Sequence, residues 1–207
     1  MTVDDSDGPA APASDLIPVT VTYLQMDGPP RRSPPPVPAT PHAIMRAENP
    51  TVHFYRYLYD TVGEAWTWSK RRWLSDGDLA AIVSDENVEI MVLYVRGVPA
   101  GFAELDFRDL PDTADLAYFG LMPEFIGQKF GGWFLHWAVS ELWARGPATV
   151  TVNTCTADHP SALPMYQRIG FQPVRRAEEM LRPFPAPGQR DPDGGPVVDT
   201  TDDGATA

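Results

Sequence analysis

The chain has little cysteine, no long apolar run and a shortage of positive charge. Its 207 residues include one cysteine, Cys155, which excludes an internal disulfide and fits a reducing compartment. No apolar stretch approaches the roughly 20 residues that span a bilayer, and the start MTVDDSDGPAAP lacks the basic and apolar parts of a signal peptide. We therefore expect a cytoplasmic protein without a membrane partner.

Acidic residues outnumber basic ones by 28 to 16, which gives a net charge of −12. Three aspartates in residues 1–14 and five in residues 184–207, against Arg190, contribute more than half of this charge. An acidic chain without a basic stripe argues against nucleic acid as a partner. The charge is compatible with a cationic amine substrate, or it serves solubility alone.

The composition predicts one domain, residues 15–183, between two disordered acidic tails. Residues 1–14 and 184–207 are rich in Asp, Gly, Pro, Ala and Thr and bury too little apolar surface to offset the entropy of ordering. Residues 27–43 are dense in proline and are expected to form a loop laid over the domain, with a disordered linker as the alternative.

Hydrophobic periodicity predicts an alternation of strands and helices. Strands are expected over 16–26, 90–95, 98–107, 114–122, 148–154 and 171–181, and helices over 51–66, 75–85, 130–145 and 161–169. The first helix is expected to bury Phe54, Tyr57 and Leu58 on one face. The third is expected to bury Phe134, Ala138 and Leu142 and to stop at Gly146-Pro147.

The segment GLMPEFIGQKFGGWFLHWAVSEL (120–142) combines the end of a strand, a glycine-rich turn and the start of a helix. The first backbone N–H groups of a helix have no partner within it and lie at the positive end of its dipole, so they can hold an anion. Gly127, Gly131 and Gly132 would let an anion approach the backbone closely. The alternative is that these glycines only form a turn.

A second segment, TVTVNTCTADHPSALPMYQRIGF (149–171), holds a strand, a polar turn, a helix with Tyr166 and a closing Gly170-Phe171. In their order and spacing, the two segments resemble the GNAT (GCN5-related N-acetyltransferase) superfamily, from about Ile90 to Leu181. The resemblance implies an α/β fold with a mixed, mostly antiparallel central sheet, a splayed strand pair and helices on both faces.

The resemblance also implies acetyl-CoA as co-substrate and no metal. The turn would hold its pyrophosphate, with Ile126, Gly127, Gln128, Lys129, Phe130, Gly131 and Gly132 as contacts. The turn departs from the family's pattern at Lys129, where a side chain replaces a glycine hydrogen, although the ammonium could bind a phosphate itself. The N–H of Leu121 or Met122 would stabilise the oxyanion. Asn153 would bond the pantetheine amides or cap the turn.

Tyr166 occupies the position of the family's proton donor to the leaving thiolate, or packs beside Phe171. Glu104, within VPAGFAEL, is the candidate base for the amine, because burial can raise the pKa of a carboxylate. It could instead point outward, with a chain of waters as the base.

Four residues, Trp66, Trp68, Arg71 and Tyr118, are candidates to bind a substrate with an apolar body and a carboxylate. The predicted function is acetyl transfer from acetyl-CoA to a primary amine of a small molecule, such as an amino acid or amine-containing acid, by direct attack. The alternative is a catalytically degenerate GNAT-like domain that binds CoA or a protein partner as sensor or scaffold. A homodimer is possible in either case.

Overall fold

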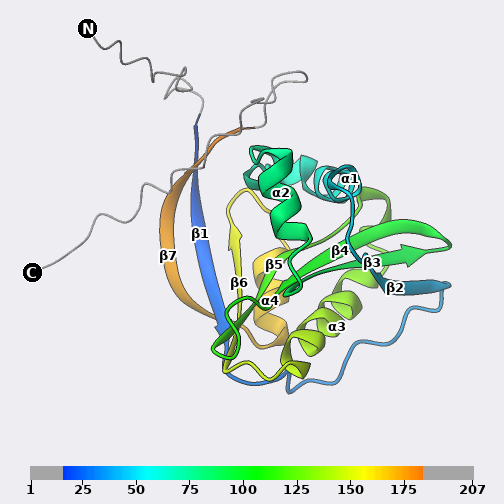
Figure 1. Cartoon of the computed structure of the whole chain (residues 1–207). Coiled ribbons are helices and arrows are strands. Elements are labelled where there is room, and N and C mark those ends of the chain that lie inside the picture. The colour runs from blue at the N-terminus through cyan, green and yellow to red at the C-terminus, as the bar shows by residue number, and fades with distance from the viewer. Residues whose placement is uncertain (1–15, 184–207) are drawn as a thin grey trace, which may run out of the picture.

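Seven strands form one open sheet in the computed structural model of the chain, which describes residues 16–183 (Figure 1). They are β1 (Ile17–Met26), β2 (His42–Arg46), β3 (Val88–Val95), β4 (Val98–Asp106), β5 (Thr113–Leu121), β6 (Thr149–Cys155) and β7 (Gln172–Leu181). The order is β2-β3-β4-β5-β6-β1-β7, and every neighbouring pair is antiparallel except β5 and β6. The predicted tails lie outside the described residues.

Helices cover both faces of the sheet, as predicted (Figure 1). The described helices are α1 (Val52–Gly63), α2 (Asp76–Val83), α3 (Phe130–Ala144) and α4 (Ala162–Ile169), with short 3₁₀ turns η2 (Glu64–Trp66), η3 (Lys70–Arg72) and η4 (Pro123–Phe125). On one face α3 and α4 pack on a core that includes Phe134, Ala138 and Leu142, the predicted stripe of α3. On the other face α1 and α2 enclose a second cluster.

The parallel strands β5 and β6 separate soon after they meet. They pair only from Thr113–Thr149 to Asp115–Thr151, although β5 continues to Leu121 and β6 to Cys155. On the other side of β5, Glu104 lies opposite Tyr118 and Leu105 opposite Leu116, so Ala117 is an extra residue in β5. Such a bulge bends its strand. The predicted splayed pair is therefore confirmed, with a local cause in β5.

The strand β2 was missed by the sequence analysis. It forms an edge of the sheet and pairs antiparallel with β3, from His42–Val95 to Arg46–Met91. With five residues after a proline-rich segment, of which only His42 and Ile44 are half-buried, it lacks the clear alternation that predicts a strand. The loop before it contacts α3, since the carbonyl oxygen of Arg32 lies 3.1 Å from His136 Nε2.

The buried face of α1 also differs from the prediction. Tyr55, Leu58 and Tyr59 are buried, whereas Tyr57 is 48% exposed and Phe54 is half-buried. Aromatic residues occur all round this helix, so hydrophobic spacing alone does not identify the face that packs on the sheet. The actual face brings the Tyr55 and Tyr59 rings, which stack on each other, over the middle of the sheet, where Tyr55 meets Phe102 edge-to-face.

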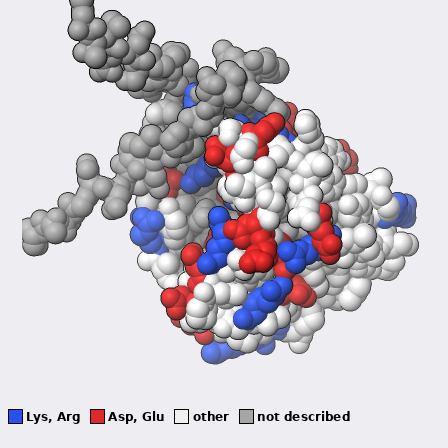
Figure 2. Space-filling view, viewed as in Figure 1, with Lys and Arg blue, Asp and Glu red and all other residues white. Residues whose placement is uncertain are grey.

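On the face seen in Figure 2, basic and acidic side chains are interspersed and form no continuous basic stripe among the described residues. Within residues 16–183, none of the helices is both long and apolar enough to cross a membrane.

Candidate active site

A cavity of about 460 Å³ opens where β5 and β6 separate. The diverging stretches of the two strands form its walls, together with α4. Its turn end, between β5 and the first turn of α3, is made by Ile126, Gly127, Lys129 and Gly131. Its β7 end is made by residues 66–70 with Glu179 and Leu181. Backbone groups that face the gap lack a partner from the neighbouring strand, so the cavity is lined with hydrogen-bonding groups as well as apolar side chains.

At the turn end, the chain enters α3 through two left-handed residues. Gly127 has φ +82°, and Lys129, the residue just before α3, has φ +67°. The Lys129 side chain does not cap the helix, so no capping group satisfies its first N–H groups. Gly127, Lys129 and Gly131 all line the cavity. The open, positive end of α3 therefore faces the space between the strands.

The two candidate oxyanion donors differ in direction. The N–H of Met122 donates to the carbonyl oxygen of Ala100 on the neighbouring chain segment, at 2.9 Å. Hydrogen-bonded positions alternate along an antiparallel pair, and Leu121 lies opposite Gly101 in this register. The N–H of Leu121 therefore points away from β4, toward the side from which β6 has diverged. Leu121 also lines the cavity, whereas Met122 is buried in the core.

Tyr166 lies on α4 with its ring packed edge-to-face on Phe171, at 6.0 Å between centroids. Tyr166 is buried and also lines the cavity, so the same residue both packs on Phe171 and reaches the cavity. Burial raises the pKa of its phenol well above the ordinary value of about 10, and the charges of Asp158 and Asp115 add to the effect. The phenol is therefore protonated at neutral pH, as a proton donor must be.

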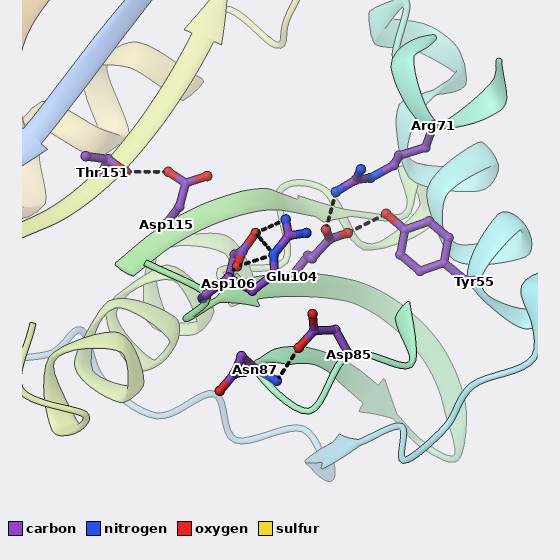
Figure 3. A network of polar contacts seen from close by, with 9 residues as sticks. Tyr55, Arg71, Asp85, Asn87, Glu104, Asp106, Asp115 and Thr151 are labelled. Atoms are coloured by element: carbon purple, nitrogen blue, oxygen red, sulfur yellow. Dashed lines mark hydrogen bonds and ion pairs between the residues drawn. The ribbon is translucent and has the colours of Figure 1, made fainter. Parts of the chain in front are cut away.

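Glu104 is fully buried on β4, on the face covered by α1, at 0% exposure (Figure 3). Its Oε1 accepts a hydrogen bond from Arg71 Nη2 at 2.6 Å, and its Oε2 accepts one from the Tyr55 hydroxyl. Burial by itself lowers the pKa of Arg71, but the attraction of Glu104 outweighs this and raises it. Neither Glu104 nor Arg71 lines the cavity. This placement favours a positioning role for Glu104 over that of a base in contact with an amine.

The Arg71 guanidinium contacts a group of three aromatic rings, Tyr59, Trp68 and Tyr118, which we call the aromatic wall. These three rings pack against one another with centroids 4.9 to 5.4 Å apart, and the Arg71 guanidinium lies 5.2 Å from the centre of the Tyr118 ring. All three residues of the wall line the cavity. The buried Glu104–Arg71 pair thus packs against the wall without lining the cavity itself.

Two carboxylates lie at the cavity surface. Asp158, in the β6–α4 turn, accepts hydrogen bonds from Trp68 Nε1 at 3.1 Å, Thr154 Oγ1 at 2.6 Å and the Cys155 N–H at 2.8 Å. Glu179 on β7 accepts one from the Tyr23 hydroxyl at 2.6 Å. Burial, with the charge of Asp158, raises the pKa of the Cys155 thiol, so no thiolate nucleophile is offered here.

A third carboxylate marks the point where β5 and β6 separate. Asp115 belongs to the last residue pair of the two strands and accepts a hydrogen bond from Thr151 Oγ1 at 2.6 Å (Figure 3). Burial raises the pKa of Asp115 to about 6, and the charge of Asp106, its partner on the neighbouring strand β4, adds to the effect. Asp106 itself keeps a lowered pKa because hydrogen bonds from Arg108 outweigh the effect of burial. Asp115 does not line the cavity.

Comparison with family models identifies the family of the chain. The model of the Acetyltransferase (GNAT) family matches residues 47–171, which is more than half of the chain. The chain belongs to the GNAT acetyltransferase family. No curated protein matches it.

Solved structures share the GNAT fold at low sequence identity. The GCN5-related N-acetyltransferase from Kribbella flavida is 15% identical with a TM-score of 0.54, covering 79% of this chain and 58% of its own. The ribosomal-protein-S18-alanine N-acetyltransferase from Escherichia coli is 20% identical with a TM-score of 0.53, covering 70% of this chain and 96% of its own. A conserved protein of unknown function from Staphylococcus epidermidis is 14% identical with a TM-score of 0.54, covering 83% and 64%. Thus this chain spans less than two thirds of the Kribbella and Staphylococcus chains.

The structure brings most of the predicted site residues of this GNAT domain to one cavity. Those that line it are Leu121, Ile126, Gly127, Lys129, Gly131, Asn153, Tyr166, Trp66, Trp68 and Tyr118. Six others do not: Met122, Gln128, Phe130, Gly132, Glu104 and Arg71. Gln128 Nε2 donates to the carbonyl oxygen of Glu124 at 2.7 Å, and Phe130 is buried in the core.

The cavity residues that the sequence reasoning did not assign to the site include Tyr59, Lys70, Asp158 and Glu179. Asp158 sits in a polar turn, where an aspartate is common for local reasons. Glu179 is on an edge strand whose side chains are mostly exposed. Only the fold brings that strand to the cavity, so no local pattern indicated it. In the described residues, no group of three or more His, Cys, Asp or Glu side chains is placed to hold a metal ion.

Lys129 offers a test of the turn end. We expect Lys129→Ala to weaken acetyl-CoA binding about tenfold and to flatten its dependence on salt, because a charge-assisted contact to phosphate is lost. Lys129→Gly should weaken binding similarly while making the fold more stable, since glycine relieves left-handed backbone strain of roughly 1 kcal/mol. Calorimetry at two salt concentrations, with thermal melts, measures both effects.

The control is Arg96, an exposed cation with φ +53° in the β3–β4 hairpin. Arg96→Ala and Arg96→Gly remove the same charge from the same backbone conformation without touching the cavity. If Lys129→Gly binds acetyl-CoA as well as the natural protein or better, Lys129 only crowds the turn and its ammonium makes no phosphate contact.

Proposed function

We propose that this GNAT protein transfers an acetyl group from acetyl-CoA to the primary amine of a small molecule, by direct attack and without a covalent enzyme intermediate. The observation that supports this best is the convergence on one cavity of the open α3 end, the Leu121 N–H and the protonated Tyr166 phenol. These are the groups needed to bind a phosphate anion, stabilise an oxyanion and protonate a leaving thiolate.

Acetyl-CoA would enter this cavity with its pyrophosphate at the turn end. The first N–H groups of α3 and the Lys129 ammonium would hold the phosphates. The pantetheine arm would lie between the separated strands, where backbone groups and the Asn153 amide can bond its two amides. The thioester would then lie near Leu121 and Tyr166, which line the same space.

In the reaction, the lone pair of the amine attacks the thioester carbonyl carbon. The N–H of Leu121 stabilises the oxyanion, the C–S bond breaks, and the CoA thiolate takes its proton from Tyr166. The ammonium loses one proton before the attack, and the attacking nitrogen loses a second as the amide forms. Through water, one of these protons returns to the Tyr166 phenolate and the other passes to solvent. We propose that Glu104 acts through Arg71 as a positioning residue and does not receive these protons, because it is buried behind the aromatic wall.

A small acceptor fits the closed shape of the β7 end. Lys70 Nζ lies 3.6 Å from Glu179 Oε2, and Trp68 donates to Asp158, so the segment 66–70 is tied to both β7 and the β6–α4 turn. Trp66 adds an edge-to-face contact with His159, at 4.7 Å between centroids. The Escherichia coli neighbour bears the name of an enzyme for an alanine of a ribosomal protein. The ties across this end favour a small molecule over a protein chain.

A second candidate function is binding of CoA without catalysis, as a sensor or scaffold. One observation favours it: Lys129 occupies a left-handed position at the turn, where a glycine would bring the backbone closest to a phosphate. Both candidates predict CoA binding, and turnover distinguishes them.

Acetyl-CoA should stabilise the folded protein. At a hundred times its Kd, linkage adds about 2.7 kcal/mol to the free energy of unfolding, which corresponds to roughly 5–10 °C in Tm for a domain of this size. Thermal melts with acetyl-CoA, with CoA and with an unrelated nucleotide measure the shift, and release of free thiol with a mixture of amines measures turnover. A folded protein whose Tm does not move at millimolar acetyl-CoA contradicts both candidates, while a shift without thiol release supports the sensor.

A further inference from the structure

Arg71 and Arg72, the two arginines that follow the cavity-lining segment 66–70, are held by acidic partners. Arg71 is held by Glu104, and Arg72 Nε lies 2.7 Å from Asp60 Oδ1. Among the described residues that line the cavity, the basic side chains are Lys70, Lys129 and His159. Lys129 lies at the turn end, and Lys70 is paired with Glu179. Among the described residues that line the cavity there is therefore no arginine fork for a substrate carboxylate, and Arg71, the predicted candidate, is engaged by Glu104.

Negative charge is present there instead. Asp158 is fixed by three hydrogen bonds, and a carboxylate has about four acceptor sites, so it retains capacity for one more donor. Glu179 accepts a hydrogen bond from the Tyr23 hydroxyl and is paired with Lys70, and its side chain is only 19% exposed. Asp158 and Glu179 against Lys70 leave one net negative charge at this end, because two negative charges face one positive charge. Both carboxylates line the cavity. An ammonium group entering from solvent would be attracted to this end of the cavity.

The remaining surface at this end is aromatic. The aromatic wall of Tyr59, Trp68 and Tyr118 faces the cavity, and Trp66 lies beside it on the same segment as Trp68. Aromatic rings pack well against other flat rings, and their faces attract cations. Two of the three rings are held in place, because Trp68 is hydrogen-bonded to Asp158 and the Tyr118 ring lies against the Arg71 guanidinium.

From these three observations we infer that the acceptor is an arylalkylamine: a primary amine on a flat aromatic body without a carboxylate. The inference rests on the proposed function and names the substrate class of the same site. The ring lies on the aromatic wall, and Asp158 and Glu179 attract the ammonium. Acetylation converts the cation into a neutral amide, so the product loses the electrostatic attraction that the substrate had, which favours its release.

Matched pairs of acceptors test the inference. The pairs are 2-phenylethylamine against phenylalanine and tryptamine against tryptophan, which differ only in the carboxylate, with butylamine as an amine that lacks a ring. We expect kcat/KM from thiol release to be at least about tenfold higher for each arylalkylamine than for its amino acid and for butylamine. Equal or higher values for the amino acids, or for butylamine, overturn the inference.

Binding gives a readout independent of turnover. Calorimetry of 2-phenylethylamine and tryptamine against the CoA-loaded protein should show binding that weakens about tenfold in Trp68→Leu and in Glu179→Gln. Glu179→Gln keeps the size of the side chain and an oxygen that can accept the Tyr23 hydrogen bond, so it provides the test even if Trp68→Leu is unstable. Binding that neither change weakens overturns the inference.

The outcomes separate this inference from the proposed function. Acetylation of another amine, while arylalkylamines bind the wall without being acetylated, supports the proposed function and overturns the inference. Acetylation that favours amino acids supports the proposed function and overturns the inference. If acetyl-CoA does not bind, the proposed function fails, and calorimetry of the amines against the unloaded protein still decides the inference.

Discussion

Tyr166→Phe is expected to lower kcat by about 10²–10⁴-fold while leaving acetyl-CoA affinity nearly unchanged. The change removes only the phenolic proton donor, and the ring remains to pack on Phe171. Without a donor, the thiolate leaves as a stronger base and the barrier to C–S cleavage rises. Steady-state kinetics with the best acceptor measure kcat, and calorimetry measures acetyl-CoA binding.

The control for this substitution is Tyr57→Phe, which removes the same hydroxyl from a half-exposed tyrosine on α1 that does not line the cavity. Its kcat should stay near that of the natural protein. Because burial raises the pKa of Tyr166, the natural protein should also lose no activity through this group as pH rises to about 10. If Tyr166→Phe keeps its kcat, Tyr166 is a packing residue, and another group protonates the thiolate.

The turn end of the site could be predicted from sequence because its features are local. A strand, a glycine-rich turn and a helix follow one another within residues 120–142, and the stripe of Phe134, Ala138 and Leu142 fixes the helix on the core. The splay between β5 and β6 followed from the family resemblance. Its local cause, the bulge at Ala117, is a matter of register between two strands, which spacing within one strand does not show.

The β7 end could not be predicted in the same way. Its charges depend on which partner each side chain meets across the fold: Arg71 turns to Glu104, 33 residues away, and Trp68 to Asp158, 90 residues away. Strand alternation left Glu104 to point either inward or outward, and only the packing of Tyr55 on that face decides it. The prediction that Arg71 binds a substrate carboxylate was made without knowledge of these pairings.

Glu104→Gln should be the most destabilising of the substitutions considered, at about 3–5 kcal/mol, because it leaves the Arg71 cation buried without a counter-charge. For a domain with a typical stability of about 5–15 kcal/mol, this is a large loss and corresponds to a fall in Tm of roughly 10–15 °C. Denaturant and thermal unfolding measure it. Asp106→Asn, on the same strand and face but paired with the more exposed Arg108, is the control, with an expected cost below about 1 kcal/mol.

The double variant Glu104→Gln with Arg71→Met separates support of the wall from proton transfer. Replacing both partners removes the buried charge, so most of the lost stability should return. If Glu104 only positions the aromatic wall, the double variant should raise the KM of the acceptor, because Tyr118 loses the guanidinium that lies against it, and keep kcat within a few-fold. If Glu104 is the base, kcat should fall by about 10²–10⁴-fold in the double variant however stable it is. The position of Glu104, fully buried and outside the cavity lining, leads us to expect the first result.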